Sequence, residues 1–355
     1  MKRTTLTLAA ITALAGAPAY AQTDAAQPTA AQPTAKDQPR TAPGIQVERI
    51  TDLQVADRAP ELAISEWLKG EPVTGFEKGR VYVVEFWATW CGPCVASMPH
   101  ISELQKKYAD KGVRIIGVQI WEEPAMARPF VETGKGADRT DYTIAVEEKI
   151  EGEDPSRTGQ MAKTWMKAAG RNGIPSAFLI NQDGYIAWMG HPMSIDEPLE
   201  KVVAKQWDLQ EAATLHVERA RLAKSMDDFQ AAAQQGDADK AAALAKSLME
   251  HKSVWQDART LNMIAWLFVD PEGQLAGKSN ELALKAAERA VELTNHEDGM
   301  IMDTLAWAQF YAGTIDKALE TEQKAVDLAD SDQLKEQLQQ SLDLMKKMAS
   351  KSGGG

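Results

Sequence analysis

Apolar and polar positions alternate between strand and helix periods from about residue 51 to residue 205. The run 80–86 is β-branched and aromatic and follows Gly79, which predicts a buried strand. Residues 94–110 place apolar side chains at spacings of three and four, as in an amphipathic helix. Further elements are predicted as strands at 113–120 and 142–146, a helix at 161–169, and strands at 176–180 and 185–189 around the hairpin turn 181–184. This order predicts an α/β domain at 51–205 with a mixed central sheet flanked by helices.

Strand signals stop after about residue 206, and the chain up to 350 is rich in residues that favour helix. The pattern at 261–266 returns at 302–307, and that at 281–293 returns at 316–328. This indicates two or three helical hairpins, closely packed through small alanines. The pattern resembles tetratricopeptide repeats, although Glu322 stands where a large aromatic residue is usual. We therefore expect an all-α, tetratricopeptide-like domain at 206–350, followed by a flexible tail at 351–355.

The N-terminus has the pattern of an export signal. Lys2 and Arg3 precede an uncharged, mostly apolar run and the small-x-small pattern Ala19-Tyr20-Ala21, which predicts a signal peptide at 1–21. The apolar run is short for a bilayer span, although an uncleaved membrane anchor is the alternative. Residues 22–50, rich in Ala, Gln, Pro and Thr, predict a disordered linker. We expect a periplasmic protein that is soluble after signal cleavage.

The charge of the chain excludes some classes of partner. The formal net charge is −12, with 51 acidic and 39 basic side chains. Nucleic acids and anionic membrane surfaces are held by clustered Lys and Arg, so neither is an expected partner.

The chemistry is concentrated in one short segment, FWATWCGPC at 86–94, which contains both cysteines of the chain. The segment follows a predicted strand and opens a predicted helix, whose N-terminus would stabilise Cys91 as a thiolate. Cys94 lies one turn further on and can close a small disulfide, while Gly92 and Pro93 permit and stiffen the turn. A zinc site is the first alternative, but no second cysteine pair or histidine spacing completes it. A purely structural disulfide is the second, but the loop is too short to restrain the unfolded chain much.

Together these residues resemble the thioredoxin superfamily, and more narrowly its TlpA-like, redoxin branch of exported thiol-disulfide oxidoreductases. The resemblance covers about residues 53–200 and is most specific at Trp90-Cys91-Gly92-Pro93-Cys94. It is supported by 59–60 (Ala-Pro), by Pro99, and by 173–175 (Gly-Ile-Pro) before a strand. The resemblance implies that Pro175 is cis and faces the disulfide, with Ile174 pairing its main chain with a substrate strand. A simple loop proline is the alternative.

The resemblance also implies a buried acid at Glu85, six residues before Cys91. Burial would raise the pKa of this carboxyl, so that it could take and return a thiol proton. An exposed glutamate at a sheet edge is the alternative. Trp87 and Trp90 are expected to wall the site, with plain core packing as the alternative for Trp87. His100 is interpreted as structural or at the surface, and His191 as the end of a strand, with an approach of His191 to the site as the alternative.

The resulting hypothesis is dithiol-disulfide exchange with protein substrates, most simply as a reductase reset by a membrane or exported thiol donor. The candidate catalytic residues are Cys91, Cys94 and Glu85, and the candidate substrate-binding residues are Trp90, Gly92, Pro93, Ile174 and Pro175. No metal or cofactor beyond the redox-active disulfide is expected. An oxidase is the close alternative. A peroxidase would need a Pro-x-x-x-Thr-x-x-Cys pattern, whose positions are held by Val84 and Ala88. A third alternative is an adaptor whose helical repeats bind a protein partner.

Overall fold

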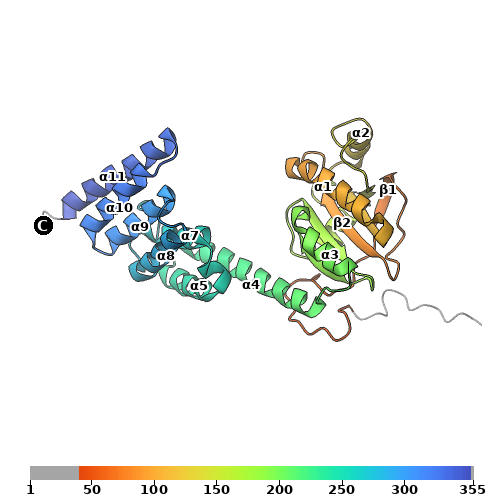
Figure 1. Ribbon diagram of the computed structural model, residues 1–355, viewed down its shortest axis with the longest axis horizontal. Coiled ribbons are helices and arrows are strands. Elements are labelled where there is room, and N and C mark those ends of the chain that lie inside the picture. Colours follow the sequence, from red (N-terminus) through yellow and green to blue (C-terminus); the bar gives the residue numbers. More distant parts are fainter. Residues whose placement is uncertain (1–39, 353–355) are drawn as a thin grey trace, which may run out of the picture. The chain divides into compact units, whose positions relative to one another are not determined.

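The computed structural model describes residues 40–352. Their first part forms a six-stranded sheet in the order β1-β4-β3-β2-β5-β6 (Figure 1). Strands β2, β3 and β4 are parallel, whereas β1, β5 and β6 are antiparallel to their neighbours. The strands are β1 Ile64–Lys69, β2 Val81–Trp87, β3 Val113–Gln119, β4 Thr143–Glu147, β5 Ser176–Ile180 and β6 Ile186–Gly190. This is a thioredoxin-like fold, as the sequence predicted, with one strand, β1, that the sequence analysis missed.

Alternating side chains of the sheet build two separate cores, because successive residues of a strand point to opposite faces. On β2, Val81, Val83 and Trp87 face one core, and its intervening residues Tyr82, Val84 and Phe86 face the other. The first core is completed by α1 (Gly92–Tyr108), α2 (Ala127–Glu132) and α3 (Asp196–Val203). The second is completed by a short π-helix (Ala162–Lys167), where an α-helix was predicted, and by the segment before the sheet. Short 3-10 turns lie at Ala109–Lys111, Pro124–Met126 and Pro192–Ser194.

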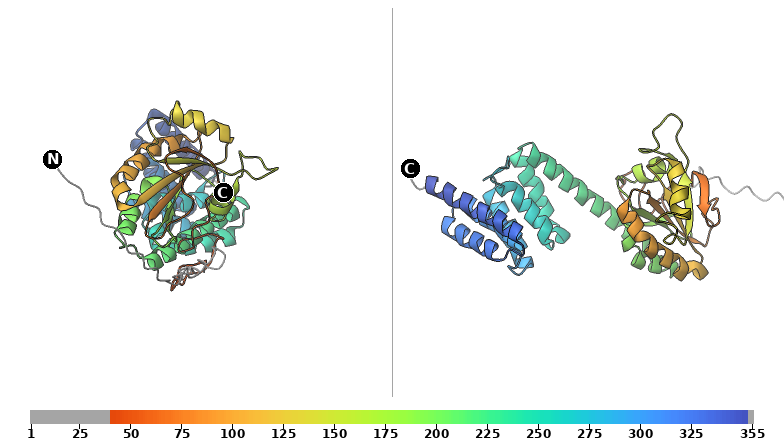
Figure 2. Two further views of the ribbon diagram at one scale, coloured as in Figure 1. Left: turned by 90° about the vertical axis from the view of Figure 1, so that its right-hand side faces the viewer. Right: turned by 90° about the horizontal axis from the view of Figure 1, so that it is seen from above.

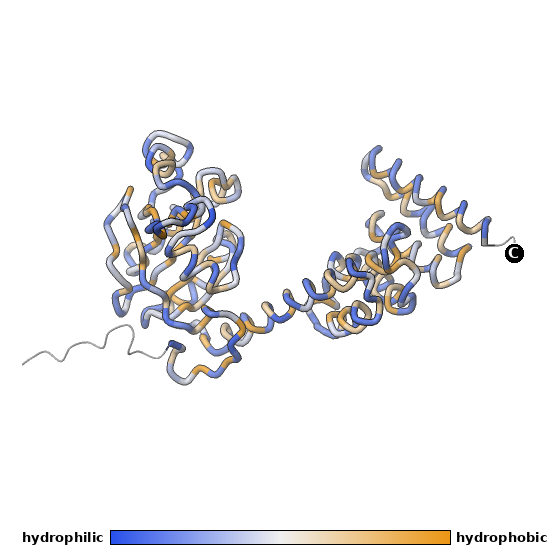
Figure 3. The backbone as a smooth tube through the Cα atoms, turned by 180° about the vertical axis from the view of Figure 1, so that it is seen from behind, coloured by the Kyte–Doolittle hydropathy of each residue, from blue (hydrophilic) through white to orange (hydrophobic). Residues whose placement is uncertain are grey.

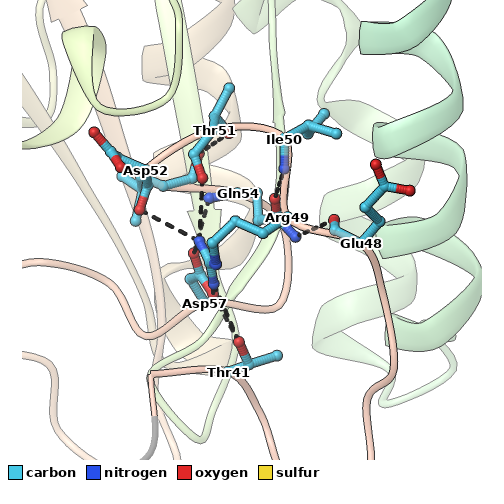
Figure 4. Close-up of polar contacts among 9 residues, drawn as sticks. Thr41, Glu48, Arg49, Ile50, Thr51, Asp52, Gln54 and Asp57 are labelled. Atoms are coloured by element: carbon cyan, nitrogen blue, oxygen red, sulfur yellow. Dashed lines mark hydrogen bonds and ion pairs between the residues drawn. The ribbon is translucent and has the colours of Figure 1, made fainter.

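The segment 41–57, here called the strap, is bound to the second core. Arg49 donates two hydrogen bonds to the carboxylate of Asp57, of 2.9 and 2.7 Å, and Thr41 donates a third of 3.0 Å (Figure 4). Ala42 and Asp57 are buried. The predicted disordered linker at 22–50 is therefore wrong for residues 41–50, because Thr41 and Arg49 are held by the buried carboxylate of Asp57. The predicted signal at 1–21, and the linker up to residue 39, lie outside the described residues.

The second part of the described chain is entirely helical. Its helices are α4 Leu209–Gln234, α5 Ala238–Glu250, α6 Lys252–Trp255, α7 Ala258–Val269, α8 Asn280–Leu293, α9 Gly299–Tyr311, α10 Ile315–Asp327 and α11 Asp332–Ser352. Consecutive helices pack as hairpins, α4 on α5, α7 on α8 and α9 on α10 (Figure 2). Apolar positions recur along each of them (Figure 3), and the alanines at 283, 290, 318 and 325 are fully buried. The predicted tail is wrong at its start, because α11 continues to Ser352.

Helix α4 does not begin a separate domain at residue 206. Ala213 is buried in the second core of the sheet, whereas Phe229 is buried among the helices. The predicted boundary between 205 and 206 therefore has to be corrected, because one helix supplies side chains to both cores. None of the described helices is long and apolar enough to cross a bilayer.

Glu322, the exception in the repeat pattern, is fully buried on α10 beside Asp303 of α9. Burial first, and then the charge of Asp303, raises the pKa of Glu322 to about 9. Ser341 of α11 donates a 2.6 Å hydrogen bond to Asp303 and accepts one of 2.9 Å from Trp307. A polar cluster thus replaces an aromatic side chain at this point of the helical core.

Candidate active site

Cys91 and Cys94 lie at the point where the chain leaves β2 and enters α1, and they form a disulfide with a Cα–Cα distance of 5.3 Å. Cys91 is the N-cap of α1, and its sulfur accepts a 3.2 Å hydrogen bond from the backbone N–H of Cys94. Gly92 and Pro93 fill the first two helical positions, where the missing N–H of proline costs nothing. A negative charge on the Cys91 sulfur would therefore meet an N–H donor and the positive end of the helix dipole.

The two cysteines are both buried and differ only slightly in exposure. Cys94 is fully buried, whereas Cys91 is 3% exposed. Trp90, directly before the pair, is 61% exposed, and its indole N–H donates to the carbonyl of Trp121 over 3.4 Å. Trp87 is fully buried in the same core as the cysteines and packs against Phe130, with ring centroids 5.4 Å apart. Of the two tryptophans expected to wall the site, only Trp90 is available to an incoming chain.

Pro175 follows a cis peptide bond from Ile174. It comes directly before β5, which pairs with β2 so that Ser176 lies opposite Phe86. Ser176 donates to the carbonyl of Gly173 over 2.8 Å, which closes the turn around the proline. The implied cis bond is thus present, and β5 begins at the same end of the sheet at which β2 leads to the cysteines.

Glu85 is fully buried in the middle of the sheet, not exposed at an edge. It lies two residues before Trp87, so its side chain points to the face that holds the disulfide. Opposite it on β3 is Gly117, where an added Cβ would lie 3.3 Å from a Glu85 oxygen and 2.8 Å from the ring of Tyr142. Gly117 therefore leaves the space in which the carboxyl and the phenol ring meet.

Burial raises the pKa of Glu85 to about 8, because neither of its oxygens has a hydrogen-bond partner to stabilise the charged form. The hydroxyl of Tyr142 is also buried without a partner, and burial first, then the Glu85 charge, raises its pKa. At neutral pH the Glu85 carboxyl thus holds a proton in the core layer that contains Cys94.

Comparison with known proteins identifies this arrangement. Residues 54–205 match the family model described as Redoxin. Protein FixW of Rhizobium leguminosarum is 30% identical over 162 residues, which make up 44% of this chain and 69% of FixW. The chain belongs to the redoxin family. It is a thiol-disulfide oxidoreductase of this family, with Cys91 and Cys94 as its cysteine pair.

Other similar proteins cover a comparable share of the chain. Thiol-disulfide oxidoreductase ResA of Bacillus thuringiensis subsp. konkukian is 28% identical and covers 43% of this chain and 79% of its own. Among solved structures, a thiol-disulfide isomerase from Corynebacterium glutamicum is 22% identical, with a TM-score of 0.36 over 42% of this chain and 95% of its own. A putative thiol:disulfide interchange protein DsbE from Chlorobium tepidum is 26% identical, with a TM-score of 0.32 over 43% and 99% of the two chains.

The redoxin domain contains one residue near the cysteines that the sequence analysis missed. The carboxylate of Glu122, after β3, accepts hydrogen bonds from the backbone N–H and the hydroxyl of Thr89. It also accepts one of 2.9 Å from Gln119. Glu122 therefore holds the turn that leads into Trp90 and Cys91. A single acid in a loop gives no periodic signal, so only the fold brings it to this turn.

The two histidines interpreted as structural have local partners. His100 lies 2.9 Å from a carboxylate oxygen of Asp196, between α1 and α3. His191 accepts a hydrogen bond from the N–H of Met193, which caps a short turn. Among the described residues no group of three or more His, Cys, Asp and Glu side chains could hold a metal ion.

Proposed function

We propose that this redoxin is an exported protein-disulfide reductase that works by dithiol-disulfide exchange. The observation that carries the proposal is the asymmetry of the cysteine pair. Cys91 caps α1 directly after the exposed Trp90, and Cys94 lies one turn further along, fully buried on the face of the sheet to which Glu85 points. One sulfur is thereby suited to attack a substrate and the other to resolve the product.

In the reduced protein the Cys91 thiolate attacks one sulfur of a substrate disulfide. The S–S bond of the substrate breaks, its other sulfur leaves as a thiolate, and a mixed disulfide to Cys91 forms. Cys94 then loses its proton to the ionised form of Glu85, which a pKa of about 8 leaves as the minor form at neutral pH, and attacks the Cys91 sulfur. This step releases the second substrate thiolate and closes the Cys91–Cys94 disulfide, so two electrons pass from the dithiol to the substrate. An external dithiol donor would reduce the pair again.

The substrate would be held by groups on either side of the cysteines. The exposed ring of Trp90 and the turn at Gly92 and Pro93 would cover one side. The main chain at Ile174 and Pro175 would pair with the substrate in an extended conformation. The helices after α4 would provide a surface for a further protein partner, as helical repeats commonly do.

Two cysteine variants test the mechanism. Cys91→Ser should abolish the reduction of insulin disulfides, whereas Cys94→Ser should accumulate mixed disulfides that are visible on non-reducing gels. Full activity in both variants would refute the mechanism.

The direction of electron flow follows from the reduction potential of the Cys91–Cys94 pair, measured in glutathione or dithiothreitol buffers. A value near about −270 mV supports a reductase, and one near about −120 mV would assign a disulfide donor instead.

Export is tested on the N-terminus of the mature protein. Cleavage after Ala21 would leave Gln22 as the first residue of the protein recovered from the periplasmic fraction. Recovery of the uncut chain from the cytosolic fraction would refute export.

A further inference from the structure

A cavity of ≈ 900 Å³ lies beside β6, one of the two edge strands of the sheet. Its walls come from the loop before the cis-proline, from the start of α3 and from the first half of α4. The cavity extends to Gly190 at the end of β6. Gly190 pairs with Ala177, two residues after Pro175, so this end of the cavity lies next to the proposed path of the substrate chain. The lining residues do not include Cys91 or Cys94.

Arg171 in this cavity is a half-buried cation without a carboxylate partner among the described residues. Its Nε donates a 2.9 Å hydrogen bond to the Ser176 hydroxyl, which ties the guanidinium to the turn around Pro175. Burial lowers the pKa of Arg171, because taking a cation out of water without a counter-ion is unfavourable. The guanidinium therefore has donors to spare for an anion from outside the described chain.

Two side chains of α4, His216 and Arg219, also line the cavity. The Nε2 atom of His216 is buried and has no hydrogen-bond partner, and Arg219, one turn along, is exposed. Burial first, and then the charges of Arg171 and Arg219, lowers the pKa of His216 to about 4. The charge of Asp57 also reaches His216, but that carboxylate is already bound by Arg49. At neutral pH the imidazole is uncharged, and the positive charge comes from the two guanidiniums.

The acidic side chains that line the cavity have contacts of their own. Glu197 forms a 2.6 Å ion pair with Lys201, and the charge of Glu211 also acts on Lys201. Asp208 accepts a 2.9 Å hydrogen bond from the N–H of Glu211 and so caps α4. Among the described residues, the lining guanidiniums of Arg171 and Arg219 form no ion pair, whereas Lys201 is paired with Glu197.

We propose that this cavity is a subsite for a carboxylate of the disulfide-bearing polypeptide, bound by Arg171 and Arg219 and by the Nε2–H of His216. The planar guanidinium fork matches a carboxylate, and a neutral imidazole adds a donor. A polypeptide is favoured over a small acid because Arg171 is joined through Ser176 to the turn that would hold the substrate main chain. The inference rests on the proposed function and names a substrate class for it, namely disulfides with an acidic residue nearby.

The test uses the full-length protein and pairs of disulfide peptides that differ only in Glu against Gln. In successive pairs this residue is moved one position at a time away from the cysteine, on either side. At one position the wild-type protein should reduce the Glu peptide with a kcat/KM about tenfold above that of the Gln peptide, as one charge-assisted contact provides. Arg219→Gln should remove this preference. Arg221→Gln is the matched control, because Arg221 lies on the same helix outside the cavity and pairs with Glu48.

A binding measurement separates this inference from the reductase proposal. The same peptides with serine in place of their cysteines are titrated into the oxidised protein, so the result does not depend on disulfide exchange. Tighter binding of the Glu peptide to wild-type protein, lost in Arg219→Gln, would support the subsite even if no peptide is reduced. Equal binding and equal reduction of Glu and Gln peptides at every position would overturn it while leaving the reductase proposal intact. Arg219-dependent stabilisation by free glutarate, without any peptide preference, would also overturn the assignment to a polypeptide.

Discussion

Replacing Glu85 by Gln should make the stability of this redoxin less dependent on pH. Burial raises the pKa of Glu85 from 4.5 to about 8, so the folded protein keeps a proton there that the unfolded chain releases. The stability that depends on this proton is fully present below pH 4.5. It decreases as the pH rises towards 8, because the unfolded state then gains the ionised form that the core disfavours. Glutamine has the same shape as the protonated acid and cannot ionise.

The size of the effect follows from the two pKa values. The difference between 4.5 and about 8, at 1.36 kcal/mol for each pH unit, is about 5 kcal/mol at and above pH 8. At pH 4 the variant and the wild type should have nearly equal free energies of unfolding, because both side chains are then neutral. At pH 9 the variant should be the more stable protein, with a melting temperature higher by about 10 to 20 °C.

The assay is urea unfolding of the oxidised protein, followed by tryptophan fluorescence between pH 4 and pH 9, with the redoxin transition compared between the two proteins. Glu103→Gln is the matched control, since Glu103 is an exposed glutamate on α1. Its difference from the wild type should not change with pH. A Glu85→Gln difference that is constant across this range would refute the conclusion that the buried carboxyl is protonated in the folded state.

Three further changes have defined outcomes. Gly117→Ala should destabilise the redoxin domain by about 1–3 kcal/mol in chemical unfolding, since the new Cβ would lie 2.8 Å from the Tyr142 ring; an unchanged midpoint would contradict this. Asp57→Asn should cost about 2 kcal/mol, because an amide cannot accept both Arg49 hydrogen bonds, and protease should then cut the strap faster. Burial of Glu322, with a pKa of about 9, predicts that Glu322→Gln gains helical stability over the wild type as the pH rises from 5 to 9. The measurement is thermal unfolding followed by circular dichroism, and a stability difference between Glu322→Gln and the wild type that is the same at every pH would contradict the prediction.

The sequence could predict the parts of the fold that rest on local patterns. The buried run of β2, the periodic helix α1 and the turn between them are continuous in the chain, so the order of residues alone locates the cysteine site. Strand β1 was missed because Ile64–Lys69 alternates weakly and lies at the edge of the sheet, where burial imposes little pattern. The cis bond at Pro175 was implied only by resemblance.

Other features depend on contacts between distant residues and leave no local signal. Glu122 reaches Thr89 only because β3 lies beside β2. The burial of Glu85 was an expectation from the family, but the room made for it by Gly117 appears only in the register of two strands. The end of the linker was placed too late, because a single buried acid, Asp57, holds polar residues that by composition resemble a disordered segment.

Helix α4 sets a condition on how this protein can be divided or recombined. A redoxin segment that ended at residue 205 would lose Ala213 from beneath its sheet, and a helical segment without α4 would lose Phe229. Each half should therefore be more stable as an exchanged segment when a copy of α4 accompanies it, in the laboratory or in a gene fusion. Because α4 contributes to both cores, local unfolding of this helix by heat or denaturant should destabilise both the cysteine-bearing half and the helical repeats.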